Sequence, residues 1–248
     1  MKRTILAIML ALSLPALAQD NQQTIDTAKV IMDRYADLMN TKAIRQDSIL
    51  YMETYIYYRS TPHDTAIMKR WFLPPNRFRC ELWHGDTLLQ GVYSDGKTVF
   101  REYNYKILDG WTRVAESRYY TLVPGYEFRG PLHNWRAAGS EVKYRGLWNF
   151  KGSEVHRVLM ETPLRYNRYL LFEKESGLLF LIQETNEHSE YSSHQSYDHA
   201  DWHAYHEYQP IGTVLLPSVE SYQMGGDIVF HFTNYKYIPV NMSIFTSN

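Results

Sequence analysis

The fold of this chain is decided by residues 71–105, WFLPPNRFRCELWHGDTLLQGVYSDGKTVFREYNY. This stretch predicts three strands in succession, each with one apolar face. Phe78, Cys80 and Leu82 alternate with charged residues, which is the period-2 pattern of a strand that is solvated on one side. No nucleophile motif, carboxylate pair or phosphate loop occurs in the stretch, so it predicts a surface and not a catalytic centre.

The second and third of these strands are predicted to form a hairpin. Residues 88–94 and residues 98–103 are two apolar runs that meet across Asp95-Gly96. An Asp-Gly pair supplies the positive φ values that a tight type I′ turn requires. The sequence therefore predicts an antiparallel meander in this region.

The first 18 residues indicate a secretory signal peptide. A basic pair, Lys2-Arg3, precedes an apolar stretch at residues 5–14, and Ala16-Leu17-Ala18 forms a small-residue cleavage site. A membrane anchor is disfavoured because the apolar stretch is shorter than the roughly 20 residues that span a bilayer. We therefore expect cleavage after Ala18 and a periplasmic mature protein.

The mature chain, residues 19–248, is expected to be a single domain with a substantial hydrophobic core. Without the signal peptide, 24 basic side chains stand against 27 acidic ones, a net charge of −3, which does not favour nucleic acid as a partner. The one cysteine, Cys80, cannot form an intrachain disulfide and is expected to be packed in the core. Aromatic residues make up 15% of the chain, which suits strands and cavity walls.

Periodicity over the rest of the chain predicts a mainly β, α+β fold. Apolar residues at spacings of three and four predict one amphipathic helix at Thr24–Asn40, and the pattern fades between Gly110 and Gly152. Further strands are predicted at residues 49–59, 66–73, 154–162, 165–172, 178–185, 205–208, 215–223 and 227–237. This order describes a curved antiparallel sheet with helices covering one face.

The chain resembles the LolA-like family of periplasmic outer-membrane lipoprotein carriers. The resemblance lies in the Pro75-Asn76 strand end and in the hairpin VYSDGKTVF, residues 92–100. It implies a half-open antiparallel β-barrel with a few helices covering its concave face. It also implies a non-enzymatic carrier that passes lipoprotein acyl chains, or another lipid, from an inner-membrane transporter to an outer-membrane acceptor.

One position departs from the family pattern. Carriers of the family place an arginine just before the Pro-Asn pair, where it hydrogen-bonds the backbone of the lid helices. Pro74 stands there in this chain and has no backbone N–H to donate. Arg70 and Arg77 are the neighbouring arginines.

Large apolar and adaptable side chains are the candidates for lining a lipid cavity. Each residue, taken by itself, is also explained by ordinary core packing, so both interpretations stay open for the set. The candidates are Met32, Met52, Phe72, Phe78, Leu82, Val92, Phe100, Leu159, Leu171, Phe230 and Phe232.

A histidine-rich segment offers an alternative function. It contains His188, His194, His199, His203 and His206, with Asp198, Asp201 and Glu207 among them. On a helix, His199 and His203 would share one face as zinc ligands do, but the HExxH glutamate is missing. The pattern favours a solvated loop or hairpin without bound metal.

We therefore predict a monomeric lipid-binding protein with no catalytic residues, no metal and no cofactor. Two alternatives remain at this stage. One is a regulatory protein that senses lipoproteins, and the other is a metal-dependent extracytoplasmic hydrolase that uses the segment His188–His206.

Overall fold

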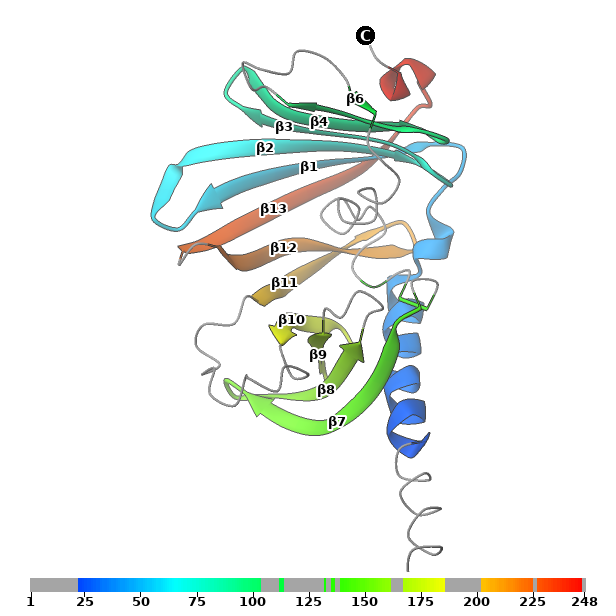
Figure 1. Cartoon of the computed structure of the whole chain (residues 1–248), viewed down its shortest axis with the longest axis vertical. Helices are drawn as coiled ribbons and strands as arrows, with labels where there is room; N and C mark the ends of the chain where they lie inside the picture. Colours follow the sequence, from blue (N-terminus) through cyan, green and yellow to red (C-terminus); the bar gives the residue numbers. More distant parts are fainter. Residues whose placement is uncertain are drawn as a thin grey trace, which may run out of the picture. The chain divides into compact units, whose positions relative to one another are not determined.

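Antiparallel strands and one long helix make up most of the structure, a computed structural model (Figure 1). The residues that it describes are 22–103, 112–113, 132, 135–136, 139–161, 167–185, 202–224 and 227–246. The chain divides into two compact units. The first unit comprises Met1–Leu38 and Asn134–Trp202, and the second comprises Met39–His133 and His203–Asn248.

The first unit combines the N-terminal helix, residues 22–39, with four antiparallel strands. Their order in the sheet is β10-β9-β8-β7. Their bounds are Glu141–Phe150 for β7, Ser153–Glu161 for β8, Asn167–Glu173 for β9 and Leu179–Thr185 for β10.

Strand β7 corrects the prediction that this region is irregular. Gly146 has a φ of 95°, and the pairing with β8 shifts register between Tyr144 and Leu147. A bulge of this kind interrupts the alternation of apolar and polar residues. The period-2 pattern therefore does not identify this strand in the sequence.

The second unit holds a longer sheet in the order β6-β5-β4-β3-β2-β1-β13-β12-β11. Strand β1 pairs with β13, although the two strands are far apart in the sequence. The bounds are η1 Thr41–Ala43, β1 Ile49–Tyr58, β2 Thr61–Leu73, β3 Arg77–His84, β4 Thr87–Asp95, β5 Val99–Tyr103, β6 Thr112–Arg113, β11 Trp202–Ile211, β12 Val214–Met224, β13 Asp227–Ile238 and η4 Met242–Phe245.

The meander predicted from residues 71–105 is confirmed as β3, β4 and β5, but its second turn is longer than predicted. The last pair before the turn is Ser94 with Val99, so four residues connect the strands. The Asp95 carboxylate accepts hydrogen bonds from the backbone N–H groups of Thr98 and Lys97, both at 2.8 Å. These bonds lower the pKa of Asp95 and stabilise an Asx-type loop in place of the two-residue turn.

The predicted helix is confirmed over the described residues 22–39. It ends before Asn40, whose left-handed φ of 46° stops the helical path. The side chain of Asn40 donates a hydrogen bond to the Thr213 carbonyl at 3.1 Å. No helix within the described ranges is both long and apolar enough to cross a membrane.

The sheet of the second unit has one deeply buried face. Because paired residues share a face, Phe72, Phe78, Cys80 and Val92 lie on it together, and each is 1–4% exposed. Burial raises the pKa of the Cys80 thiol to about 12, so Cys80 is a packing residue as predicted.

The opposite face of this sheet is partly covered by the C-terminal segment. Phe245 of η4 is 1% exposed and packs in a cluster with Ile49 and Leu73. Arg79 also donates hydrogen bonds to the carbonyls of Ile244 and Thr246, both at 3.2 Å. The last residues of the described chain are thus held on β3.

Candidate functional site

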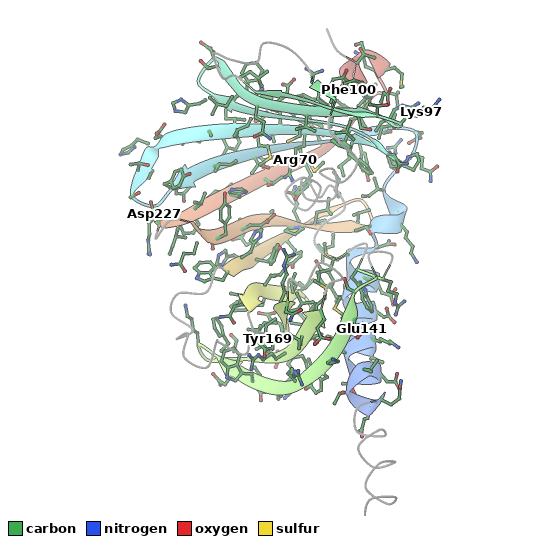
Figure 2. All side chains as sticks on the ribbon, in the orientation of Figure 1. Arg70, Lys97, Phe100, Glu141, Tyr169 and Asp227 are labelled. Atoms are coloured by element: carbon green, nitrogen blue, oxygen red, sulfur yellow. The ribbon has the colours of Figure 1, made fainter. Side chains whose placement is uncertain are left out.

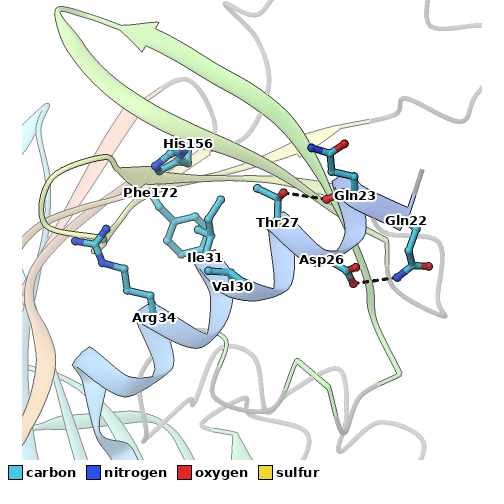
Figure 3. Close-up of a pocket in the computed structure, with 10 residues that line it drawn as sticks. Gln22, Gln23, Asp26, Thr27, Val30, Ile31, Arg34, His156 and Phe172 are labelled. Atoms are coloured by element: carbon cyan, nitrogen blue, oxygen red, sulfur yellow. Dashed lines mark hydrogen bonds between the residues drawn. The ribbon is translucent and has the colours of Figure 1, made fainter. Parts of the chain in front are cut away.

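A groove of about 710 Å³ opens beside the N-terminal helix of the first unit (Figure 3). Its walls come from the helix, from strands β8 and β9, and from the turn that follows β9. The residues that line it are Gln22, Gln23, Asp26, Thr27, Val30, Ile31, Arg34, His156, Phe172 and Gly177.

Two neighbouring stripes of the helix have different roles. Ala28, Met32 and Tyr35 follow one another at helical spacing and are at most 2% exposed, so this stripe anchors the helix on the sheet. The next stripe carries Ile31, half-buried, and Val30, which is 68% exposed. The helix therefore presents apolar side chains to the groove in addition to those it buries.

The floor of the groove is set by the pairing of β8 with β9. His156 pairs with Phe172, so the two side chains lie on the same face of the sheet, and Phe172 has no exposed area. The Phe172 ring lies 5.5 Å from the ring of Tyr35, centroid to centroid. In Figure 3, Ile31 lies against Phe172, which makes the central part of the groove apolar.

Polar contacts hold the helix beside the turn between β9 and β10. The Arg34 guanidinium donates hydrogen bonds to the carbonyl of Glu175 at 2.5 Å and to that of Lys174 at 3.4 Å. Asp33, one residue earlier, forms an exposed ion pair with Arg136 at 2.6 Å. The rim of the groove is therefore charged while its floor is apolar.

Gly177 of this turn lies against the Arg34 side chain. Its φ is +76°, a left-handed conformation, and a Cβ placed there would lie 2.6 Å from Nε of Arg34. We expect Gly177→Ala to lower the free energy of unfolding by about 1–3 kcal/mol, measured by urea denaturation, because it adds both backbone strain and a clash.

Gly212→Ala is the matched control for this prediction. Gly212 also has a positive φ, +66°, but no atom of the residues that the structure describes lies within 4 Å of a Cβ added there. The control variant carries the backbone strain without the clash. Equal losses of stability in the two variants would show that the Arg34 contact does not constrain the turn.

His156 adds no net charge to the groove near neutral pH. Burial lowers the pKa of its imidazole, and the positive charges of Arg34 and Lys174 lower it further. Its Nδ1 lies 3.1 Å from the hydroxyl oxygen of Tyr144. A neutral, hydrogen-bonded imidazole is compatible with an apolar ligand lying over it.

The residues predicted from the sequence to line a cavity fall on four different surfaces. Five of them share the buried face of the second unit: Met52, Phe72, Phe78, Leu82 and Val92. Their common face follows directly from the strand register.

Three predicted residues lie on the opposite face of that sheet. Phe100 stacks on Tyr93 at 4.8 Å, and Phe230 and Phe232 stack on Tyr57 at 5.5 and 5.8 Å, all measured between ring centroids. Phe232 is 39% exposed. These three side chains therefore do not join the group on the buried face.

The remaining predicted residues belong to the first unit. Met32 lies in the buried stripe of the helix, whereas Leu159 and Leu171 lie on the sheet face opposite Phe172. The groove residues Val30, Ile31 and His156 were not predicted. For Val30 and Ile31, the signal in the sequence was a second apolar stripe of the helix beside the buried one.

The histidine-rich segment lies mostly outside the described residues, which include only His203 and His206 of its histidines. His203 Nε2 lies 2.7 Å from a carboxylate oxygen of Glu220, and His206 Nε2 lies 2.6 Å from the Ser221 hydroxyl. Both occur on strand β11 and contact β12. In the part of the chain that the structure describes, no group of three or more His, Cys, Asp or Glu is arranged to hold a metal ion.

Three solved structures share this fold over most of their length. A LolA superfamily protein from Nitrosomonas europaea matches 89% of this chain and 97% of its own, with 10% identity and a TM-score of 0.55. A DUF1329 family protein from Desulfovibrio piger matches 88% and 97%, with 11% identity and a TM-score of 0.58. An outer membrane lipoprotein-sorting protein domain from Vibrio parahaemolyticus matches 83% and 93%, with 9% identity and a TM-score of 0.51.

In comparisons of sequence, no protein-family model and no curated protein matches the chain. Identities of 9–11% show the fold and not the activity. The predicted fold class, a mainly antiparallel β structure of the half-open barrel type with helix, is confirmed. The chain has a LolA-like fold.

Proposed function

We propose that this protein binds the acyl chains of lipoproteins, or of another lipid, in the periplasm and carries them toward the outer membrane. In this role it receives cargo from an inner-membrane transporter and delivers it to an outer-membrane acceptor. The LolA-like fold and the signal-peptide pattern of residues 1–18 support the proposal. The observation that carries it is the groove between the N-terminal helix and the strands β8 and β9.

The groove has the size and chemistry that an acyl chain requires. Its volume of about 710 Å³ falls within the range of roughly 300–1,000 Å³ that is typical of small-molecule sites. Burying one CH₂ group contributes about 0.8 kcal/mol, so a chain that covers Val30, Ile31 and Phe172 gains several kcal/mol. Because one wall is a single helix, cargo can enter and leave without opening the sheet.

The surroundings of the groove favour binding over hydrolysis. His156 is held beside Tyr144 and is neutral, while Arg34 is occupied with two backbone carbonyls. In the second unit, described by itself, His203 of β11 faces Glu220 and His206 faces Ser221, which suits strand-to-strand contacts of that sheet. These contacts give His156, Arg34, His203 and His206 structural partners.

Ile31→Glu is the variant that tests the groove. A carboxylate beside Phe172 is expected to weaken binding of a synthetic triacylated lipopeptide at least tenfold, because an acyl chain would have to lie against a charge, which costs about 1.4 kcal/mol or more. Isothermal titration of the purified mature protein with the lipopeptide, and with the same peptide lacking its acyl chains, measures the effect.

Ala36→Glu is the matched control, because it places the same charge on an exposed position of the same helix away from the groove. It is expected to bind the lipopeptide like the unmodified protein. Binding that is equal for the acylated and the non-acylated peptide would overturn the proposed function. Equal lipopeptide binding by the Ile31→Glu variant would remove the groove from it.

A further inference from the structure

A buried cation lies on the apolar face of the second unit. Arg70 of β2 is 9% exposed, and strand pairing places it between Met52 of β1 and Cys80 of β3, which are 1% and 2% exposed (Figure 2). A guanidinium in such surroundings has lost most of its hydration. Its position therefore requires an electrostatic explanation.

The protein compensates this charge only in part. One guanidinium nitrogen of Arg70 donates a hydrogen bond to the Thr54 hydroxyl at 2.9 Å, and that hydroxyl lies 2.8 Å from the hydroxyl of Thr233. The Nε atom of Arg70 is buried and has no hydrogen-bond partner among the described residues. Among the residues with described positions, no carboxylate lies within 4 Å of the guanidinium.

The acid on the same face, Glu220, is already engaged. Its carboxylate lies 2.7 Å from His203, and the side chain is 18% exposed. Glu220 also interacts electrostatically with Arg70, but it forms no ion pair with the guanidinium within 4 Å. A buried charge without a direct ion-pair partner costs several kcal/mol, whereas the same charge paired with an anion is stabilised. Arg70 is therefore suited to receive an anionic group from a ligand.

An apolar row leads to Arg70 along the same face. Ile56 pairs with Ala66, Thr54 with Met68, and Met68 with Leu82, so these side chains share the face of Arg70. Ile56, Ala66, Met68 and Leu82 are all half-buried, in contrast to Met52 beside Arg70 and Phe72 beyond it, which are at most 3% exposed. Along this face, the apolar side chains on one side of Arg70 are partly accessible, and those beside and beyond Arg70 are fully buried.

We propose that Arg70 binds the anionic headgroup of a single-chain amphiphile whose acyl chain lies along Ile56, Ala66, Met68 and Leu82. The headgroup is a carboxylate or a phosphate, either of which accepts two parallel hydrogen bonds from a guanidinium. The inference rests on the proposed function, since the ligand is an acyl lipid. It goes further by inferring that the headgroup of this lipid is negatively charged. It assigns a second site, on the second unit, in addition to the groove.

The experiment compares two fluorescent ligands that differ only in headgroup charge: cis-parinaric acid and its methyl ester. We expect delipidated mature protein to bind the acid at least tenfold more tightly than the ester, because a charge-assisted hydrogen bond contributes about 1.5–3 kcal/mol. In Arg70→Met the ratio of the two affinities falls to about one, while the ester binds within about threefold of its original affinity.

Lys69→Met is the matched control. Lys69 is the preceding residue of β2, on the opposite face, where it pairs with Glu53 and Glu81. The ratio of affinities is expected to stay unchanged in this variant. Thermal unfolding without ligand separates a structural role from a binding role: Arg70→Met is expected to melt no lower than the unmodified protein, because it removes an incompletely paired buried charge.

Displacement of the bound acid identifies the source of the anion. If lysophosphatidic acid displaces cis-parinaric acid at a lower concentration than palmitate does, the headgroup is a phosphate. If palmitate displaces it at the lower concentration, the headgroup is a carboxylate. Equal affinity for acid and ester in the unmodified protein, or a ratio that survives in Arg70→Met, overturns the assignment of Arg70 and leaves acyl binding intact. Failure to bind either ligand overturns both this inference and the proposed function.

Discussion

Replacing Phe172 by alanine is expected to lower the free energy of unfolding by about 3–5 kcal/mol. Phe172 has no exposed area, and its ring lies 5.5 Å from that of Tyr35 on the N-terminal helix. The substitution leaves a cavity under the helix and removes the aromatic contact. Urea denaturation followed by circular dichroism measures the loss.

Phe232→Ala is the control for this prediction. Phe232 is 39% exposed and stacks on Tyr57, so its removal is expected to cost about 1 kcal/mol or less. Similar losses for the two variants would contradict the packing of the helix on β9. A large loss for Phe172→Ala alone would confirm that the groove floor also anchors the helix.

His231 is expected to make the folded protein less stable as the pH falls from 6.5 to about 4. Burial lowers the pKa of its imidazole from 6.5 to about 4, although the Glu220 carboxylate opposes the shift, while the Coulomb interactions with His203 and Arg70 reinforce it. Between these values the unfolded chain binds a proton that the folded protein does not bind. Stability therefore decreases with falling pH, by on the order of 3 kcal/mol for the complete window.

Urea titrations of the unmodified protein and of His231→Gln, at several pH values within this window, test the prediction. Glutamine does not titrate, so the variant is expected to show a shallower loss of stability than the unmodified protein. Glu220 affects the stability of the protein in a different pH range. Burial raises its pKa, but the hydrogen bond with His203 and the Coulomb interactions with His203, His231 and Arg70 lower it more, so its contribution is lost only below its ordinary value of 4.5. Parallel stability curves for the two proteins would show that His231 is not protected from protonation.

The types of most elements were predictable from local patterns. The helix at residues 22–39 follows from a stripe of residues three and four apart, and β3 and β4 follow from strict alternation. Strand β7 was missed because its bulge at Gly146 breaks the alternation that identifies a strand.

The candidate site was less predictable, because a period-2 pattern says that a strand has two faces but not which strands share a face. Phe78 and Phe230 are both apolar positions of good strands, yet the register from β3 through β1 to β13 places them on opposite faces. The groove depends on a contact between Ile31 and Phe172, residues about 140 positions apart, and no local pattern encodes such a contact.

The sequence by itself determined the mainly β composition of this protein, its amphipathic helix and the meander of residues 77–103, because these properties arise from side-chain periodicities within a few residues. Only the tertiary structure decided that β1 lies beside β13, that Arg70 is buried with no carboxylate of the described residues within 4 Å of its guanidinium, and that the helix forms one wall of a groove. These features depend on strand register and on packing between distant segments. Both are determined by the free energy of the whole folded chain and not by the residues of one stretch.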